Sequence, residues 1–178
     1  MGKTRYIISY IVILVVAISV LGPAYAKGPK EIYLSGVKAI RSGNSNFALF
    51  DFRQIIKEFP NSKFAEPALF MIGENYFAMS NYYDANKAFQ KHIELYPDSK
   101  RKLFSLVYLL KLARIYKKES LIKDLEKEII SFYQLSFLFR DFKTYEHKSP
   151  SYKKYKAVYY IDKVEFYIDG EQFEKIPF

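Results

Sequence analysis

The sequence predicts an all-α fold, a solenoid of helical hairpins that ends in a short C-terminal segment of different character. Three observations predict it. The sequence repeats itself at an interval of 37 residues, apolar side chains recur at helical spacing through residues 30–130, and period-two alternation replaces that spacing near the C-terminus. A repeat of this length indicates a solenoid, in which each unit buries its apolar face only against its neighbours.

The repeat is visible when the sequence is shifted by 37 residues, because Gly36 then falls on Gly73 and Asn44 on Asn81. Seven further pairs align along the second helix of each unit and the turn after it: Ala48 with Ala85, Phe52 with Phe89, Ile56 with Ile93, Phe59 with Tyr96, Pro60 with Pro97, Ser62 with Ser99 and Lys63 with Lys100. The shift therefore defines two equivalent units.

Small and large residues are combined where the two helices of the second unit are expected to cross. Gly73 and Ala85 are small there, and Tyr76 and Phe89 fill the space beside them. This spacing, with Pro97 after it, resembles the signature of the tetratricopeptide repeat. The phrase that joins the units, residues 59–68, is similar to that of two bacterial cell-envelope families, the β-barrel assembly lipoprotein and the Tol-Pal-associated periplasmic protein. The resemblance covers roughly residues 30–118.

Local signals place the individual helices. The first is predicted at residues 30–41, and Asn46 is predicted to cap the second. Pro60 ends the second helix because proline lacks an N–H donor and restricts the residue before it. A third, atypical unit begins at Lys100, breaks at residues 117–120 and is expected to cap the solenoid.

The pattern changes after residue 132. A helix is expected to continue to about Lys143, followed by a basic, polar linker. Residues 164–168 then alternate between apolar and polar side chains ahead of Asp169 and Gly170, which is a hairpin signal. A helix through the same stretch fits as well, so both readings stay open. We expect the segment to pack on the last repeat, because an isolated hairpin is only marginally stable in water.

The N-terminus has the features of an export signal. Lys3 and Arg5 precede an apolar run at residues 6–21, and Ala24, Tyr25 and Ala26 follow it. This order is typical of a secretory signal peptide, cleaved here after Ala26 to release a periplasmic protein; an uncleaved inner-membrane anchor is the alternative. The predicted domains are a signal peptide at 1–26, tetratricopeptide-like repeats at 27–133, and a basic linker with a C-terminal hairpin or helix at 134–178.

Composition narrows the classes of partner. Without residues 1–26 the chain keeps 26 cationic and 19 acidic residues, a net charge of +7. In an exported protein this charge favours an acidic protein or an anionic lipid surface over nucleic acid, and a solvated basic face explains it equally well. The chain has no cysteine. Because the β-barrel assembly lipoprotein carries its lipid on a cysteine, this absence argues against membership of that family.

No catalytic pattern stands out, which predicts a protein that is not an enzyme and holds no cofactor or metal. His92 and His147 have no cysteine or paired carboxylate at metal-ligand spacing. His92 is expected to be a packed structural residue, and His147 a solvated one in the linker.

The resemblance implies a concave groove that is lined by the first helix of each unit and holds a peptide. Carried over by position, the partner-binding residues are Tyr33, Phe70, Glu74, Phe77, Lys111 and Arg114. Ordinary core packing explains the two phenylalanines equally well.

These observations predict a periplasmic repeat scaffold for protein–protein interaction in the cell envelope, with a role in outer-membrane assembly or maintenance. The alternative is an accessory subunit of an envelope enzyme or transporter, or a carbohydrate-binding envelope protein, that recognises its partner through the C-terminal segment. No oligomeric state is predicted.

Overall fold

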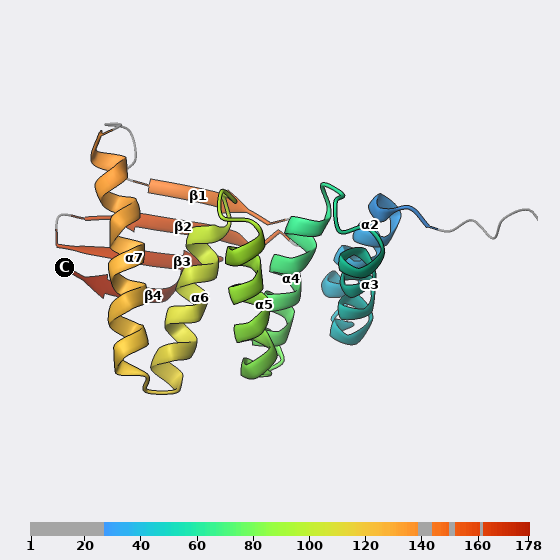
Figure 1. Cartoon of the computed structure of the whole chain (residues 1–178), viewed down its shortest axis with the longest axis horizontal. Coiled ribbons are helices and arrows are strands. Elements are labelled where there is room, and N and C mark those ends of the chain that lie inside the picture. The colour runs from blue at the N-terminus through green and yellow to red at the C-terminus, as the bar shows by residue number, and fades with distance from the viewer. Residues whose placement is uncertain (1–26, 139–143, 150–151, 161) are drawn as a thin grey trace, which may run out of the picture.

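The structure, a computed structural model, describes residues 27–138, 144–149, 152–160 and 162–178, with the side chains of residues 133–138 left out. The predicted signal peptide lies outside the described residues. Helices come first in the described chain and strands follow (Figure 1): α2 (Pro29–Arg41), α3 (Ser45–Glu58), α4 (Ala65–Ala78), α5 (Tyr82–Leu95), α6 (Lys102–Ile115), α7 (Glu119–Leu138), β1 (Thr144–Lys148), β2 (Lys154–Tyr159), β3 (Lys163–Ile168) and β4 (Glu171–Pro177).

The helices form three successive hairpins, α2–α3, α4–α5 and α6–α7, that stack along the long axis of the molecule (Figure 1). This arrangement confirms the predicted helical-hairpin repeats. One helix cap differs from the prediction: the Phe47 N–H donates to the side chain of Asn44, not Asn46, at 3.1 Å. Asn81, which is equivalent to Asn44 in the repeat, caps α5 in the same way. None of the described helices is long and apolar enough to cross a membrane.

The two repeat glycines lie where helices pack closely. A Cβ atom added to Gly73 would lie 2.7 Å from Cε1 of Phe89, and one added to Gly36 would lie 2.7 Å from Cε1 of Phe52. Both rings are fully buried. The 37-residue repeat therefore preserves one contact, a helical glycine against a phenylalanine ring of the next helix.

The strands form one antiparallel sheet in the order β1-β2-β3-β4. Asp169 and Gly170 have φ angles of 54° and 88°, as a two-residue hairpin turn between β3 and β4 requires. The predicted hairpin is confirmed, and the helical alternative for this stretch is wrong. The all-α prediction is wrong for the C-terminal part as well, because β1 and β2 make the chain a mixed α and β protein.

Strand β1 lies within the stretch that was predicted to be a polar linker. Its charged residues Glu146 and Lys148 are exposed, while Tyr145 and His147 face the helices: the Tyr145 ring stacks on Phe104 at 5.8 Å between centroids. The side of β1 that faces the helices is formed by tyrosine and histidine, which are only partly apolar. The alternation between apolar and polar residues that marks a strand is therefore weak in this part of the sequence.

The sheet covers the first helices of the second and third units, so that α4 and α6 lie between two layers. Phe70 of α4 contacts both Phe89 of α5, at 5.8 Å between ring centroids, and Tyr155 of β2, also at 5.8 Å. The inner side of the sheet is at most 1% exposed at Tyr155, Ala157, Val164, Phe166 and Ile176. Helices and sheet therefore share one core, and the C-terminal segment packs on the last repeat, as predicted, and also on the second.

Candidate interaction surfaces

Five of the six residues predicted to line a partner-binding groove contact the C-terminal sheet of the same chain. Phe70 and Glu74 meet β2 and the residue before it, whereas Phe77, Lys111 and Arg114 meet β4. The sixth, Tyr33, packs on Phe52 and Phe64, with ring centroids 5.7 and 5.3 Å away. The face formed by α4 and α6 is therefore filled from within the molecule.

Aromatic rings make up most of this helix–sheet contact. Phe173 of β4 packs edge-on against Phe77 and Tyr108, with ring centroids 5.7 and 5.0 Å away. Tyr108, which the sequence did not single out, also stacks on Phe89 at 4.5 Å. Aromatic contacts of this kind add about 0.5–1.5 kcal/mol each beyond the area they bury. The aromatic floor predicted for a peptide is thus part of the core.

Glu74 of α4 binds two residues of the C-terminal segment, Tyr155 and Lys153. It is 3% exposed, accepts a hydrogen bond from the Tyr155 hydroxyl, and lies 3.3 Å from the Lys153 ammonium. Burial raises the pKa of Glu74, and the positive charge of Lys153 opposes that shift. A buried carboxylate needs such partners, since an unpaired one would cost several kcal/mol.

Lys111 and Arg114 hold the edge of β4. Arg114 pairs with Glu174 of β4 and, at 2.6 Å, with Glu126 of α7, while it also donates to the Lys175 carbonyl at 3.2 Å. Lys111 donates to the Phe173 carbonyl at 3.3 Å. These side chains donate hydrogen bonds to backbone carbonyl groups of β4, an edge strand. Without them, those carbonyl groups would have no partner in the sheet. The predicted basic end of the groove is therefore engaged with the sheet.

A second polar network joins α4, α5 and α6 around His92. Its Nε2 lies 2.9 Å from Glu66 Oε1 and its Nδ1 lies 2.9 Å from Ser105 Oγ, a chain of contacts like that of a hydrolase triad. Both His92 and Ser105 are 0% exposed, so no substrate reaches the hydroxyl and the network is structural. The prediction that His92 is a packed structural residue is confirmed. Among the described residues, no group of acidic or histidine side chains could hold a metal ion.

Glu66 is the charged centre of this network. Burial alone would raise its pKa, but hydrogen bonds from His92 and Ser99 and the charge of Arg101 outweigh burial and lower the pKa to about 2. The Arg101 guanidinium lies 2.6 Å away. Glu66 is thus ionised at neutral pH and ties the second unit to the third.

His147 is not the solvated residue that was predicted. Its ring lies against Phe104 and Tyr155, with centroids 6.3 and 6.2 Å away. Burial, together with the positive charge of Arg101, lowers its pKa to about 4. The imidazole is neutral at neutral pH and belongs to the inner side of the sheet.

Among the described residues, the first unit exposes large apolar side chains at the N-terminal end of the stack. Leu34, Phe47 and Phe50 are 54%, 48% and 64% exposed. In the second unit the residue equivalent to Leu34 is Met71, which is 1% exposed. Those equivalent to Phe47 and Phe50 are Asp84 and Lys87, which line a groove against α3 of the preceding unit. The three residues therefore lie where a preceding unit would pack; we call them the open end.

The open end was not predicted, although the repeat alignment carries a signal for it. Phe47 and Phe50 are large and apolar where the equivalent unit has charged residues. Solenoids usually end in units with a polar outer face, and an exposed apolar patch commonly marks an interaction site.

Comparison with known proteins gives one family match. The model of the YfiO family, described as "Outer membrane lipoprotein", matches residues 25–157, which run from the start of the helical repeats into β2. No curated protein matches the chain.

Proposed function

Since the chain belongs to the YfiO family of outer membrane lipoproteins, we propose that it is a non-catalytic scaffold that binds another protein of the bacterial cell envelope. The match bears out the resemblance to an envelope repeat lipoprotein, so the expectation that the missing cysteine argues against membership is wrong. Export by a signal peptide at residues 1–26, and a part in outer-membrane assembly or maintenance, belong to the same proposal.

The observation that carries the proposal is the contrast between a filled face and an open end. The α4–α6 face is covered by the chain's own sheet, while Leu34, Phe47 and Phe50 lie exposed on the first unit. Binding energy at protein interfaces is concentrated in a few large, mostly aromatic anchors. We infer that the partner docks on the open end, with Phe47 and Phe50 as its anchors.

The predicted groove residues have an indirect part in this proposal. Phe70, Glu74, Phe77, Lys111 and Arg114 hold the sheet in place. A peptide could reach them only by displacing the sheet, which would expose Tyr155, Val164, Phe166 and Ile176. Each such side chain contributes about 1.5–3 kcal/mol when buried, so displacement would cost roughly 6–12 kcal/mol.

The exposed outer side of the sheet supports a second candidate. This second candidate function is that of an accessory subunit of an envelope enzyme or transporter, or of a carbohydrate-binding envelope protein. In either case the C-terminal sheet would recognise the partner. The exposed residues Lys154 and Lys156 of β2 are available for such contacts.

Capture of partners from envelope extract by three variants tests the proposal. The pair Phe47→Ala with Phe50→Ala is expected to lower recovery of the partner about tenfold or more, because each anchor contributes above roughly 1 kcal/mol. The control pair Tyr83→Ala with Leu95→Ala, also exposed on a helix, should bind like the parent. If both of these pairs bind normally and Lys111→Glu with Arg114→Glu does not, binding needs either the α4–α6 face or the sheet that Lys111 and Arg114 hold in place. Normal binding by all three variants would favour the sheet.

A further inference from the structure

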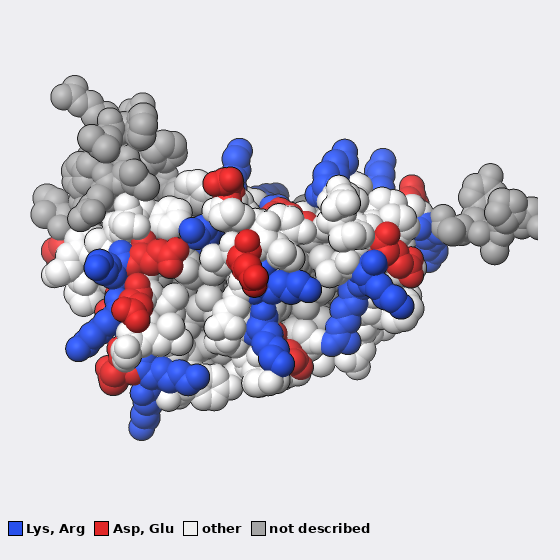
Figure 2. Space-filling view, in the orientation of Figure 1, with Lys and Arg blue, Asp and Glu red and all other residues white. Residues whose placement is uncertain are grey.

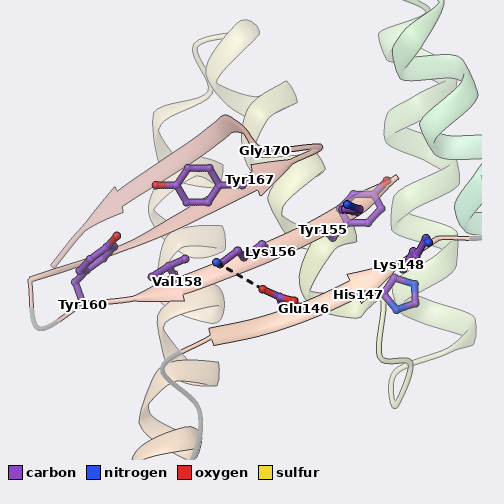
Figure 3. Close-up of a pocket in the computed structure, with 10 residues that line it drawn as sticks. Glu146, His147, Lys148, Tyr155, Lys156, Val158, Tyr160, Tyr167 and Gly170 are labelled. Carbon is purple, nitrogen blue, oxygen red and sulfur yellow. Dashed lines mark ion pairs between the residues drawn. The ribbon is translucent and has the colours of Figure 1, made fainter. Parts of the chain in front are cut away.

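The outer side of the sheet, which faces away from the helices, carries a hollow lined by lysines and tyrosines. Its volume is about 800 Å³, and Lys148 of β1, Lys154 and Lys156 of β2, and Tyr160 and Tyr167 line it. Figure 3 shows the tyrosine rings and Val158 on the β2–β3 side of the hollow, and the ion pair between Lys156 and Glu146 on its β1 side. We call this surface the lysine face.

Two of the lysines oppose each other directly. Lys148 and Lys154 are Cα partners in the β1–β2 register, so their side chains leave the same side of the sheet at neighbouring positions. Like charges in this position destabilise a sheet. In the part of the chain that the structure describes, neither ammonium group has an ion-pair partner. An anion placed between them would remove the repulsion.

Three of the acidic residues nearby, Glu146, Asp169 and Glu165, are engaged with other groups. Glu146 pairs with Lys156 at 3.5 Å, and Asp169 accepts the Lys154 backbone N–H at 2.8 Å. Glu165 pairs with Lys163 at 2.9 Å and accepts the Tyr167 hydroxyl at 2.6 Å. Among the described residues, neither Lys148 nor Lys154 forms an ion pair with these carboxylates.

A cation of α2 also lies at this corner of the sheet, against Tyr152. The Arg41 guanidinium lies 3.8 Å from the centroid of the Tyr152 ring, and the Lys148 ammonium lies 5.1 Å from it. Tyr152 is itself 57% exposed, and Tyr160, at the opposite end of β2, is 39% exposed. Lysine stems and exposed tyrosine rings are thus combined on one surface.

The helical side of the molecule is different. Figure 2 shows lysine and arginine side chains intermixed with acidic ones on the part of this face that is not drawn in grey. What distinguishes the lysine face is that two lysines, Lys148 and Lys154, lie directly opposite each other on neighbouring strands.

We propose that the lysine face docks on the phosphate headgroups of an anionic membrane surface. Basic residues near such a surface attract its lipids, and tyrosine rings sit well at headgroup level because one end is apolar and the other polar. An acidic peptide fits less well, since among the described residues only Val158 lines the hollow with an aliphatic side chain, and a bound peptide needs pockets for alternate side chains. The membrane surface is therefore the occupant.

Sedimentation of the full chain with lipid vesicles tests this proposal. The chain should bind phosphatidylglycerol vesicles and lose that binding as salt is raised; phosphatidylcholine vesicles give the baseline, including any contribution of residues 1–26. Each basic residue near an anionic surface contributes about a fivefold gain in partitioning. The variant Lys148→Glu with Lys154→Glu is therefore expected to bind at least roughly 25-fold more weakly.

A matched control carries the same change of charge on the helical side. Lys123→Glu with Lys127→Glu, two exposed positions of α7, should stay within about twofold of the parent, because the surface potential falls off within a Debye length. Lys148→Gln with Lys154→Gln should bind with intermediate strength and unfold no more easily than the parent, since it also removes the like-charge pair. If the charge-reversed variant, Lys148→Glu with Lys154→Glu, does not fold, the vesicle binding of this neutral variant still tests the proposal.

Three outcomes would overturn the proposal. Equal loss in the lysine-face and α7 variants would assign binding to net charge alone. Competition by millimolar inorganic phosphate would indicate a discrete anion site in place of a membrane surface. Binding of a polyglutamate peptide without any preference for anionic vesicles would assign the lysine face to an acidic protein.

Discussion

Gly73 shows at the residue scale how a repeat signature becomes a packing constraint. In a helix interior alanine is favoured over glycine by about 1 kcal/mol, so a glycine there needs a reason. The reason is the Phe89 ring, 2.7 Å from where a Cβ would lie. Gly36 and Phe52 repeat the arrangement one unit earlier, which makes the same substitution testable twice.

We predict that Gly73→Leu, and equally Gly36→Leu, lowers the free energy of unfolding by about 1–3 kcal/mol, because the added side chain overpacks the helix crossing. Urea denaturation measures the change. Gln90→Leu adds the same side chain at an exposed position of α5 and should stay within about 0.5 kcal/mol of the parent. An unchanged unfolding midpoint for Gly73→Leu would show that the crossing has room.

Glu66 predicts a dependence of stability on pH. Its pKa is about 2 in the folded protein against a usual value of 4.5. As pH falls, the unfolded chain binds this proton first, so the stability contributed by Glu66 is fully present above pH 4.5 and is lost between pH 4.5 and 2. Glu66→Gln should flatten the pH profile in that window and cost about 1–3 kcal/mol at pH 7.

Urea denaturation at several pH values between 7 and 3 checks this prediction. Glu94→Gln, a change at an exposed carboxyl group of α5, should leave the profile as it is in the parent. A Glu66→Gln profile as steep as the parent's would mean that other carboxyl groups cause the acid sensitivity.

At the scale of elements, the attachment of β4 to α6 depends on an ion pair across the helix–sheet contact. Glu174 is 6% exposed and pairs with Arg114, with Lys111 further away at 3.9 Å. Because Arg114→Met leaves a buried carboxylate with one distant partner, we expect it to cost about 1–3 kcal/mol. Adding Glu174→Leu should restore part of that loss.

A double-mutant cycle measures this coupling, which we expect at about 0.5–3 kcal/mol. The Lys102–Glu128 pair, 3.3 Å apart and more exposed, is the matched control and should give less than about 1 kcal/mol. Equal coupling in the two cycles would mean that β4 is not held by Arg114.

The elements that could be predicted are those fixed by local signals. Helix periods, the proline after α3 and the Asp169–Gly170 turn each act within a few residues, and the structure contains all three features. Strands β1 and β2 were missed because they depend on pairing with β3 and on the helices beneath them. Tyr145 and His147 face those helices, but their alternation with charged residues looks like a polar linker in the sequence.

At the scale of the whole molecule, the sequence placed the site residues on a common face but did not show what covers that face. Helical periodicity brings Phe70, Glu74 and Phe77 to one side of α4, and Lys111 and Arg114 to the same side of α6. The residues that meet them lie far along the chain, from 60 positions on for Arg114 and Glu174 to 96 positions on for Phe77 and Phe173 (173 − 77). A local sequence pattern gives no sign of contacts between residues so far apart. The face was therefore predicted to be an open groove, whereas in the structure it is part of the core between the helices and the sheet.

The central claim is that the C-terminal sheet fills the α4–α6 face in the protein without a partner. Nuclear Overhauser effects between aromatic ring protons test it most directly, because Phe173 lies 5.7 Å from Phe77 and 5.0 Å from Tyr108 between ring centroids. We predict cross-peaks from Phe173 to both rings, and from Tyr155 to Phe70. Their absence, with Tyr155 and Phe173 accessible to solvent, would show that the face is open and would contradict the claim.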